Sequence, residues 1–172
     1  GLNQATVQRE QISQQVVSNL FWLSVLMSTL LAAIMAACAP LLADFYGEPE
    51  VQALAVAYAA TIVVWGLQSQ PAALLARKLA FKTIAIIEVV SLLAGFIVAV
   101  GMAYITRSYW SLFYGTIVTA AVSTIASWMA SKFKPTRLGR ADGMKEMIGF
   151  GTSIAGFDLL NFASRNADNI LI

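Results

Sequence analysis

Charged and amide side chains gather near the end of the chain, inside a segment that is otherwise apolar. They are Asp158, Asn161, Arg165, Asp168 and Asn169. At about 100° per residue they fall within roughly a third of a helix circumference. The Arg165 guanidinium is therefore within reach of Asp168 and of the amides one turn away. A site of this kind would attract an anion to Arg165, with the acids setting the position of the guanidinium.

Three interpretations of this polar face are open. A charge at mid-bilayer costs at least ~2.5–3.5 kcal/mol, so a polar face survives there only if it looks into a bundle or a water-filled cavity. The face could line a polar pathway, form a structural salt bridge between helices, or belong to a helix that lies partly outside the membrane. We favour the pathway, because ionisable residues inside membranes usually mark substrate or ion routes.

A second candidate feature is the stretch "WGLQSQPAALLARKLAFK", which contains Gln68, Gln70 and Pro71. Proline removes a helix hydrogen bond and clashes with the carbonyl four residues earlier, so a helix should bend or end here. The two glutamines could satisfy the freed backbone groups or face water. The feature is typical of a gating element, and equally of a plain helix terminus.

The sequence contains no constellation typical of an enzyme. It has no His, and Cys38 is its single cysteine, so a His-based catalytic set, a disulfide framework and a thiolate metal cluster are all excluded. Asp158 and Asp168 would lie about 15 Å apart along a helix, too far to act on one bond. We expect no enzymatic activity, no cofactor and no metal site. Nucleic-acid binding is not expected either, because the bases lie in loops that flank apolar segments.

The elements that must position these residues are membrane-spanning helices. The chain of 172 residues is 59% hydrophobic and only 12% charged, whereas soluble domains carry about 25% charged residues. We therefore predict an all-α, polytopic transmembrane bundle. A spanning helix needs about 20 apolar residues, and this predicts spans at about 16–42, 51–75, 84–105, 109–130 and 150–172. Residues 131–149 form the longest non-spanning piece, either a segment on the membrane surface or a solvated linker.

The charges of the connecting loops predict the orientation of the helices. The "ARKLAFK" loop and the "SKFKPTRLGR" loop are basic, whereas "DFYGEPE" carries acids and no base. By the positive-inside rule, the basic loops face the cytoplasm, and so does the stretch Gly1–Gln15. Glu88 is expected near the membrane interface.

Small residues recur at the spacing of close helix packing. Ser91, Gly95 and Ala99 are four residues apart, and so are Ser123, Ser127 and Ser131. We expect both sets to lie at helix–helix contacts. The chain also has no initiator Met and stops inside an apolar segment, so we expect it to be a piece of a longer protein.

Three stretches resemble the Wzx-type polysaccharide flippases, and more closely the colanic-acid-exporter-like branch of that polysaccharide synthesis family. They are "FYGEP", "RKLAFK" and "FASRNADN". The branch belongs to the multidrug/oligosaccharidyl-lipid/polysaccharide exporter superfamily. The resemblance implies two helical lobes around a central cavity. Residues 1–130 would form most of the N-terminal lobe, 131–149 the cytoplasmic interlobe linker, and 150–172 the first helix of the C-terminal lobe.

The resemblance also implies an activity in the bacterial inner membrane. A Wzx-type flippase moves undecaprenyl-diphosphate-linked oligosaccharide across the membrane by alternating access, and proton or sodium coupling is possible. Arginine binds phosphate in a forked geometry, so Arg165 is the residue best suited to the diphosphate. The implied partners are the lipid-linked oligosaccharide, membrane lipids, a polysaccharide polymerase and glycosyltransferases.

Other functions are open from the sequence. A drug or cation antiporter of the same superfamily would use Asp158 or Asp168 as a cation site. A structural membrane subunit would use the charged face only to join helices. A membrane-embedded glycan polymerase or ligase would need a large periplasmic loop, and the loops here are short.

Overall fold

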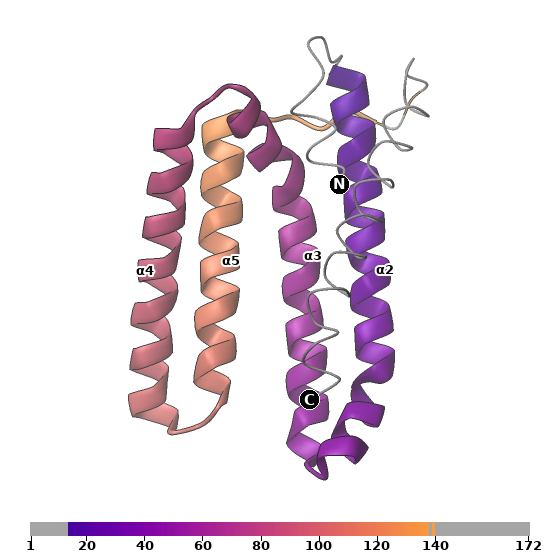
Figure 1. The fold of residues 1–172 in the computed structure, drawn as a ribbon, viewed down its shortest axis with the longest axis vertical. Helices are drawn as coiled ribbons and strands as arrows, with labels where there is room; N and C mark the ends of the chain where they lie inside the picture. Colours follow the sequence, from indigo (N-terminus) through magenta and orange to yellow (C-terminus); the bar gives the residue numbers. More distant parts are fainter. Residues whose placement is uncertain (1–13, 138, 140–172) are drawn as a thin grey trace, which may run out of the picture.

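All regular structure in the described part of the chain is helical. The computed structural model describes residues 14–137 and 139 (Figure 1). The helices are α2 Gln14–Tyr46, α3 Pro49–Arg77, α4 Phe81–Thr106 and α5 Trp110–Ser131. Each of these 4 helices is long and apolar enough to cross a membrane. The predicted all-α membrane bundle is confirmed.

The helices extend a few residues beyond the spans expected at about 16–42, 51–75 and 84–105, and α5 begins one residue after the expected 109. The turn after α2 uses Gly47 at φ +70°, and Pro49 opens α3 at a position where a missing N–H costs nothing. Two other helices end on a residue in the left-handed region, Arg107 for α4 and Lys132 for α5. The span expected at 150–172 and the division into two lobes lie outside the described residues.

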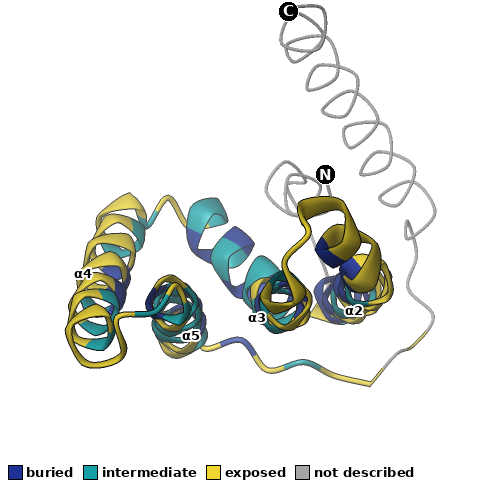
Figure 2. Cartoon of the chain, turned by 90° about the horizontal axis from the view of Figure 1, so that it is seen from below, coloured by how far each residue is buried: buried dark blue, intermediate teal, exposed yellow. Residues whose placement is uncertain are grey.

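The four helices stand in a row, in the spatial order α2, α3, α5, α4 (Figures 1 and 2). The hairpin α2–α3 and the hairpin α4–α5 each pack along their length, and α3 against α5 joins the two hairpins. Successive helices run in opposite directions, so the loops alternate between the two ends of the row.

Charge separates the two ends of the row. One end, here called the basic end, holds the start of α2, the α3–α4 turn and the end of α5. Among the described residues, its bases are Arg77, Lys78, Lys82, Lys132, Lys134 and Arg137. The opposite, acidic end holds the α2–α3 and α4–α5 turns, with Asp44, Glu48, Glu50 and Arg107. Glu88 is exposed and lies seven residues into α4, about 10 Å from its first residue.

Small residues bring the helices of each hairpin into close contact. In α4, Ser91 is 2% exposed and Gly95 is buried, as the spacing predicts. A Cβ added to Gly95 would lie 2.6 Å from the Gly115 carbonyl oxygen and would collide with the Thr119 hydroxyl. In the other hairpin, a Cβ on Gly66 would lie 2.6 Å from Cβ of Ser28. Backbones can approach this closely only because these positions carry little or no side chain.

The outer surfaces of the row are apolar. Large hydrophobic side chains of the outermost helix α4 are exposed, with Phe96 at 66% and Ile97 at 67%. Helix α2 at the other edge exposes Leu26 at 64% and Leu41 at 67%. In Figure 2 the surfaces of α2 and α4 that face away from their neighbours are mostly exposed, and buried residues lie chiefly where helices meet and on the strap. This pattern is unfavourable in water and favourable in lipid, where apolar side chains need no cover.

Beyond α5, residues 132–137 and 139 form a strap that crosses the basic end and reaches α2 (Figure 1). The Phe133 ring is buried, 8% exposed, between Phe21 of α2 and Trp128 of α5. Ring centroids lie 5.5 Å from Phe21 and 5.7 Å from Trp128, in edge-on arrangements. The described part of the segment expected as a linker is therefore packed against the bundle.

Polar side chains in the first turns of α2 bind the backbone of the strap. The Asn19 amide donates to the Gly139 carbonyl at 2.6 Å, and its oxygen accepts from the Gly139 N–H at 3.2 Å. The Ser18 hydroxyl accepts from the Thr136 N–H at 3.0 Å, and the Trp22 indole donates to the Thr136 carbonyl at 2.9 Å. Further bonds to strap carbonyls come from Gln14 and Gln15. Side chains thus supply the partners that a neighbouring strand would give to extended backbone.

At the acidic end, Tyr109 connects the two turns. A hydrogen bond with the Glu50 carboxylate raises the pKa of Tyr109, and burial of the phenol and the charge of Glu50 add to the rise. The neutral phenol is the form that donates to a carboxylate. Ionisation of Tyr109, which its raised pKa delays to more alkaline solution, would remove this donor.

Adding one methyl group at Gly95 should separate α4 from α5. We expect Gly95→Ala to destabilise the full-length protein by about 1–3 kcal/mol, because the neighbouring backbone has to move. Thermal unfolding in detergent measures this change. The matched control is Gly101→Ala on the same helix, where a Cβ meets nothing within 4 Å and alanine should gain about 0.5–1 kcal/mol of helix propensity. Equal effects of the two substitutions would contradict the packing described above.

Candidate functional site

The structure describes only one of the two groups of residues that the sequence marks as functional. Gln68, Gln70 and Pro71 all lie in α3. The other group lies outside the described residues, and its expected role remains a prediction; it comprises Asp158, Asn161, Arg165, Asp168 and Asn169.

Helix α3 continues through Pro71 to Arg77 instead of ending there. Figures 1 and 2 show its last part inclined away from the rest of the helix, toward α4. Pro71 itself is buried at less than 2% exposure, and Gln70 beside it is fully buried. Of the two outcomes expected at Pro71, a bend or an end, the structure has the bend.

The carbonyl that Pro71 frees has a partner on another helix. A residue at position 71 would normally donate its N–H to the Leu67 carbonyl, and proline has no N–H to give. The Trp128 indole of α5 donates to this carbonyl at 3.0 Å. In hydrocarbon, an unsatisfied backbone carbonyl costs several kcal/mol, so a donor at this position makes the bend tolerable.

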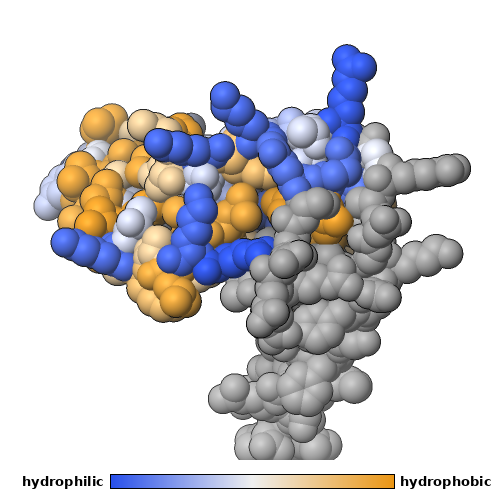
Figure 3. Space-filling model, turned by 90° about the horizontal axis from the view of Figure 1, so that it is seen from above, coloured by the Kyte–Doolittle hydropathy of each residue, from blue (hydrophilic) through white to orange (hydrophobic). Residues whose placement is uncertain are grey.

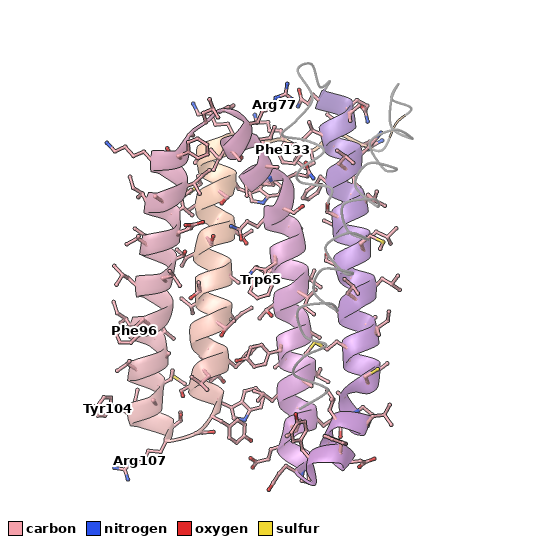
Figure 4. The ribbon with its side chains drawn as sticks, viewed as in Figure 1. Trp65, Arg77, Phe96, Tyr104, Arg107 and Phe133 are labelled. Carbon is pink, nitrogen blue, oxygen red and sulfur yellow. The ribbon has the colours of Figure 1, made fainter. Side chains whose placement is uncertain are left out.

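Further hydrogen bonds join α3 to α5 within a turn of the freed carbonyl. The Gln68 amide donates to the Ser123 hydroxyl at 2.6 Å, and the Ser127 hydroxyl lies 3.5 Å from the same nitrogen. The Thr124 hydroxyl donates to the Val64 carbonyl at 3.3 Å. Together with Trp128–Leu67, these contacts form a polar seam between the two helices. Figure 4 shows nitrogen- and oxygen-bearing side chains between the α3 and α5 ribbons in this region.

The polar seam consists of neutral groups. It holds amide, hydroxyl and indole side chains, and none of these titrates near neutral pH. Among the described residues, no group of His, Cys, Asp and Glu could hold a metal ion. These neutral groups can only form or exchange hydrogen bonds between α3 and α5. Such bonds suit a contact that sets the angle between the two helices.

Sequence reasoning found the bend but missed the residue that stabilises it. The sequence predicts that Gln68 and Gln70 either satisfy the freed backbone groups or face water. Gln68 instead bonds to the Ser123 hydroxyl, and the Trp128 indole is the donor to the Leu67 carbonyl. Trp128 reads as an interfacial aromatic, because it lies close to the end of a span. Only the register between α3 and α5 shows that its indole N–H reaches the right carbonyl. The sequence gives only a weak indication of this bond, because any long side chain with a donor on a helix that packs near the proline could make it.

Comparison with known proteins places the chain among polysaccharide biosynthesis proteins. Residues 1–172 match a family described as "Polysaccharide biosynthesis protein". The teichuronic acid biosynthesis protein TuaB of Bacillus subtilis (strain 168) is 24% identical over 174 residues, which is 100% of this chain and 36% of TuaB. The lipopolysaccharide biosynthesis protein WzxC of Escherichia coli (strain K12) is 23% identical over 174 residues, covering 100% of this chain and 35% of WzxC.

The chain therefore spans about a third of the length of the curated relatives it matches. No solved structure matches the chain.

The bond between Trp128 and Leu67 can be tested with a double-mutant cycle in the full-length protein. Trp128→Phe removes the N–H and should cost about 0.5–2 kcal/mol of stability, the range for hydrogen bonds between membrane helices. In a Pro71→Ala background this cost should fall, because alanine restores an N–H that can bond to the Leu67 carbonyl. Thermal unfolding of the four proteins in detergent gives the coupling.

The control for the loss of indole volume is Trp65→Phe, since Trp65 lies on α3 and is 53% exposed. It should change stability little in either background. If Trp128→Phe costs the same with and without the Pro71→Ala substitution, the indole stabilises the protein by packing and not by satisfying the freed carbonyl.

Proposed function

The chain belongs to the polysaccharide biosynthesis protein family, and from this membership we propose that it is part of a transporter that flips a lipid-linked oligosaccharide across the bacterial inner membrane. The observation that carries the proposal is the family match along all of residues 1–172. The proposed substrate is an undecaprenyl-diphosphate-linked oligosaccharide destined for surface polysaccharide or lipopolysaccharide. The proposed protein is not an enzyme, because flipping changes the leaflet of the substrate and none of its bonds.

The described helices support a transporter of this kind. They give a multi-pass membrane protein with 4 candidate spans. The bases of the α3–α4 turn and of the strap gather at one end, and the acids of the α2–α3 turn at the other. By the positive-inside rule, the basic end faces the cytoplasm. The substrate would then be received at this end and released at the acidic end.

The proposed substrate site is the polar face at the end of the chain. Arg165 would bind the diphosphate through its forked N–H groups, and Asp158 and Asp168 would hold the guanidinium in place. Asn161 and Asn169 would offer hydrogen bonds to the same group. Because each charge is costly in lipid, this face would have to line an aqueous cavity.

Alternating access requires helices that can change their inclination, and the bend of α3 suits this role. Gln68, Gln70 and Pro71 would act as a gating joint, with the segment after Pro71 moving against α5 as hydrogen bonds of the polar seam exchange. Coupling to protons or sodium would supply the driving force. A polysaccharide polymerase and glycosyltransferases would act after and before the flipping step.

The proposed role of Arg165 can be tested by complementation. Full-length protein carrying Arg165→Ala should insert into the membrane normally but fail to restore surface polysaccharide in a strain that lacks the gene. The reason is that the diphosphate would lose its cationic partner in a low-dielectric site. Surface polysaccharide is measured by immunoblot, and insertion by the amount of protein in membrane fractions.

Two further variants make the result specific. Arg107→Ala, which removes a base from the acidic end, should restore export fully. Asp168→Asn distinguishes the drug or cation antiporter, because loss of drug resistance with normal surface polysaccharide would favour that function. Normal export by Arg165→Ala would remove Arg165 from the proposed site.

A further inference from the structure

The basic end carries a surface that combines cations with exposed apolar side chains. Figure 3 looks down on this end, where hydrophilic side chains fan out beside apolar patches. Lys78, Lys82, Lys132 and Lys134 are all exposed. No acid is present in the described turn or strap at this end. A surface of one sign of charge, set at the edge of a membrane-spanning bundle, favours anions in the adjacent headgroup layer.

The α3–α4 turn has a definite shape. The Leu79 N–H donates to the Ala76 carbonyl at 2.9 Å, and the Ala80 N–H donates to the Leu75 carbonyl at 3.1 Å. These are the two bonds of a Schellman motif, in which the residue after the helix cap takes the left-handed conformation. Leu79 holds this position at φ 52°. Glycine is the usual residue there, because a side chain in this conformation costs about 1–2 kcal/mol.

The side chain of Leu79, the residue with the strained backbone, is exposed, and so is that of Phe81. Leu79 is 71% exposed and Phe81 is 62% exposed. Both are flanked by cations, since Lys78 precedes Leu79 and Lys82 follows Phe81. A protein in water gains nothing from a strained, exposed leucine. At a membrane surface the same leucine can enter the acyl layer while its neighbours contact headgroups.

We infer that the α3–α4 turn binds anionic phospholipids of the surrounding membrane. Lys78 and Lys82 contact the headgroup phosphate, and Leu79 and Phe81 insert beside the acyl chains of the same lipid. The lysines of the strap, Lys132 and Lys134, extend the cationic surface at the same end. The inference concerns lipid binding alone and does not depend on the transport activity proposed above.

The opposite end shows why the ligand is an anionic lipid and not lipid in general. The last turn of α4, next to the α4–α5 turn, also exposes large apolar side chains, Tyr104 at 83% and Ile105 at 80%. The α4–α5 turn also has a basic residue in the left-handed conformation, Arg107 at φ 47°. It shares its end of the bundle with Glu48 and Glu50, however, so its cation is offset. The two turns therefore match in apolar exposure and differ in charge.

The test measures how lipids stabilise the delipidated full-length protein in a neutral detergent. A ligand at free concentration L that binds the folded state stabilises it by RT ln(1 + L/Kd), so a tighter ligand raises Tm at a lower concentration. Phosphatidylglycerol should raise Tm at lower concentration than phosphatidylcholine. Soluble glycerol phosphate, which has the same phosphate and no acyl chains, should give no rise.

Two sets of variants separate the contributions of charge and of apolar insertion. Lys78→Gln combined with Lys82→Gln should weaken phosphatidylglycerol binding by about fivefold for each lysine and leave phosphatidylcholine unchanged. Leu79→Gly keeps the left-handed turn, so the lipid-free Tm should stay equal or rise. Its phosphatidylglycerol binding should weaken by about tenfold, because the inserted side chain is gone.

Arg107→Gln is the matched control and should leave phosphatidylglycerol binding at the wild-type level. The inference is overturned if the Lys78/Lys82 and Leu79 variants bind phosphatidylglycerol as the wild type does. It is also overturned if Arg107→Gln weakens binding equally, or if glycerol phosphate stabilises the protein as well as the lipid does.

Discussion

A backbone carbonyl without a hydrogen-bond donor is costly in hydrocarbon, and this constraint governs how α3 is joined to α5. A regular helix satisfies its own carbonyls, so it can stand alone in lipid. Pro71 breaks this independence at Leu67, and α3 then needs a donor from a neighbour. Trp128 supplies it, at the place where the two hairpins meet. The bend and the contact between α3 and α5 are thus two aspects of one requirement.

Within each hairpin, the two helices are held together in a different way, by close packing at small residues. Gly95 against Gly115 and Gly66 against Ser28 bring backbones close enough for dispersion forces along whole helices. Such contacts are non-directional and tolerate no added volume. The seam between the hairpins is directional and made of single hydrogen bonds, which can exchange partners. The row is thus joined by close backbone packing within each hairpin and by single hydrogen bonds between the hairpins.

The sequence was sufficient to predict what depends on local composition. Apolar run length predicted the helices, and small residues at four-residue spacing predicted the contact through Ser91 and Gly95. Pro71 predicted the bend, because the loss of an N–H is a property of one residue. The partner of Leu67 could not be predicted, since it depends on the register of two helices about 60 residues apart. The docking of the strap on α2 could not be predicted for a similar reason. Asn19 and Ser18 bind backbone atoms of the strap, and every residue has such atoms, so the strap's sequence does not reveal the contact. The polar face that includes Arg165 lies outside the described residues, so its role is still a prediction.

The strap has a consequence for biogenesis. Ser18 and Thr136 are 118 positions apart, and at roughly 5–20 residues per second synthesis of that interval takes about 6–24 s. During this time the first turns of α2 have been made but their extended partner has not. Until the strap has been made, Ser18 can bond to the Gln14 carbonyl and Asn19 to the Gln15 amide of the same helix, and the bonds to the strap form only after α5 is complete. Docking of the strap then marks the completion of the four-helix unit.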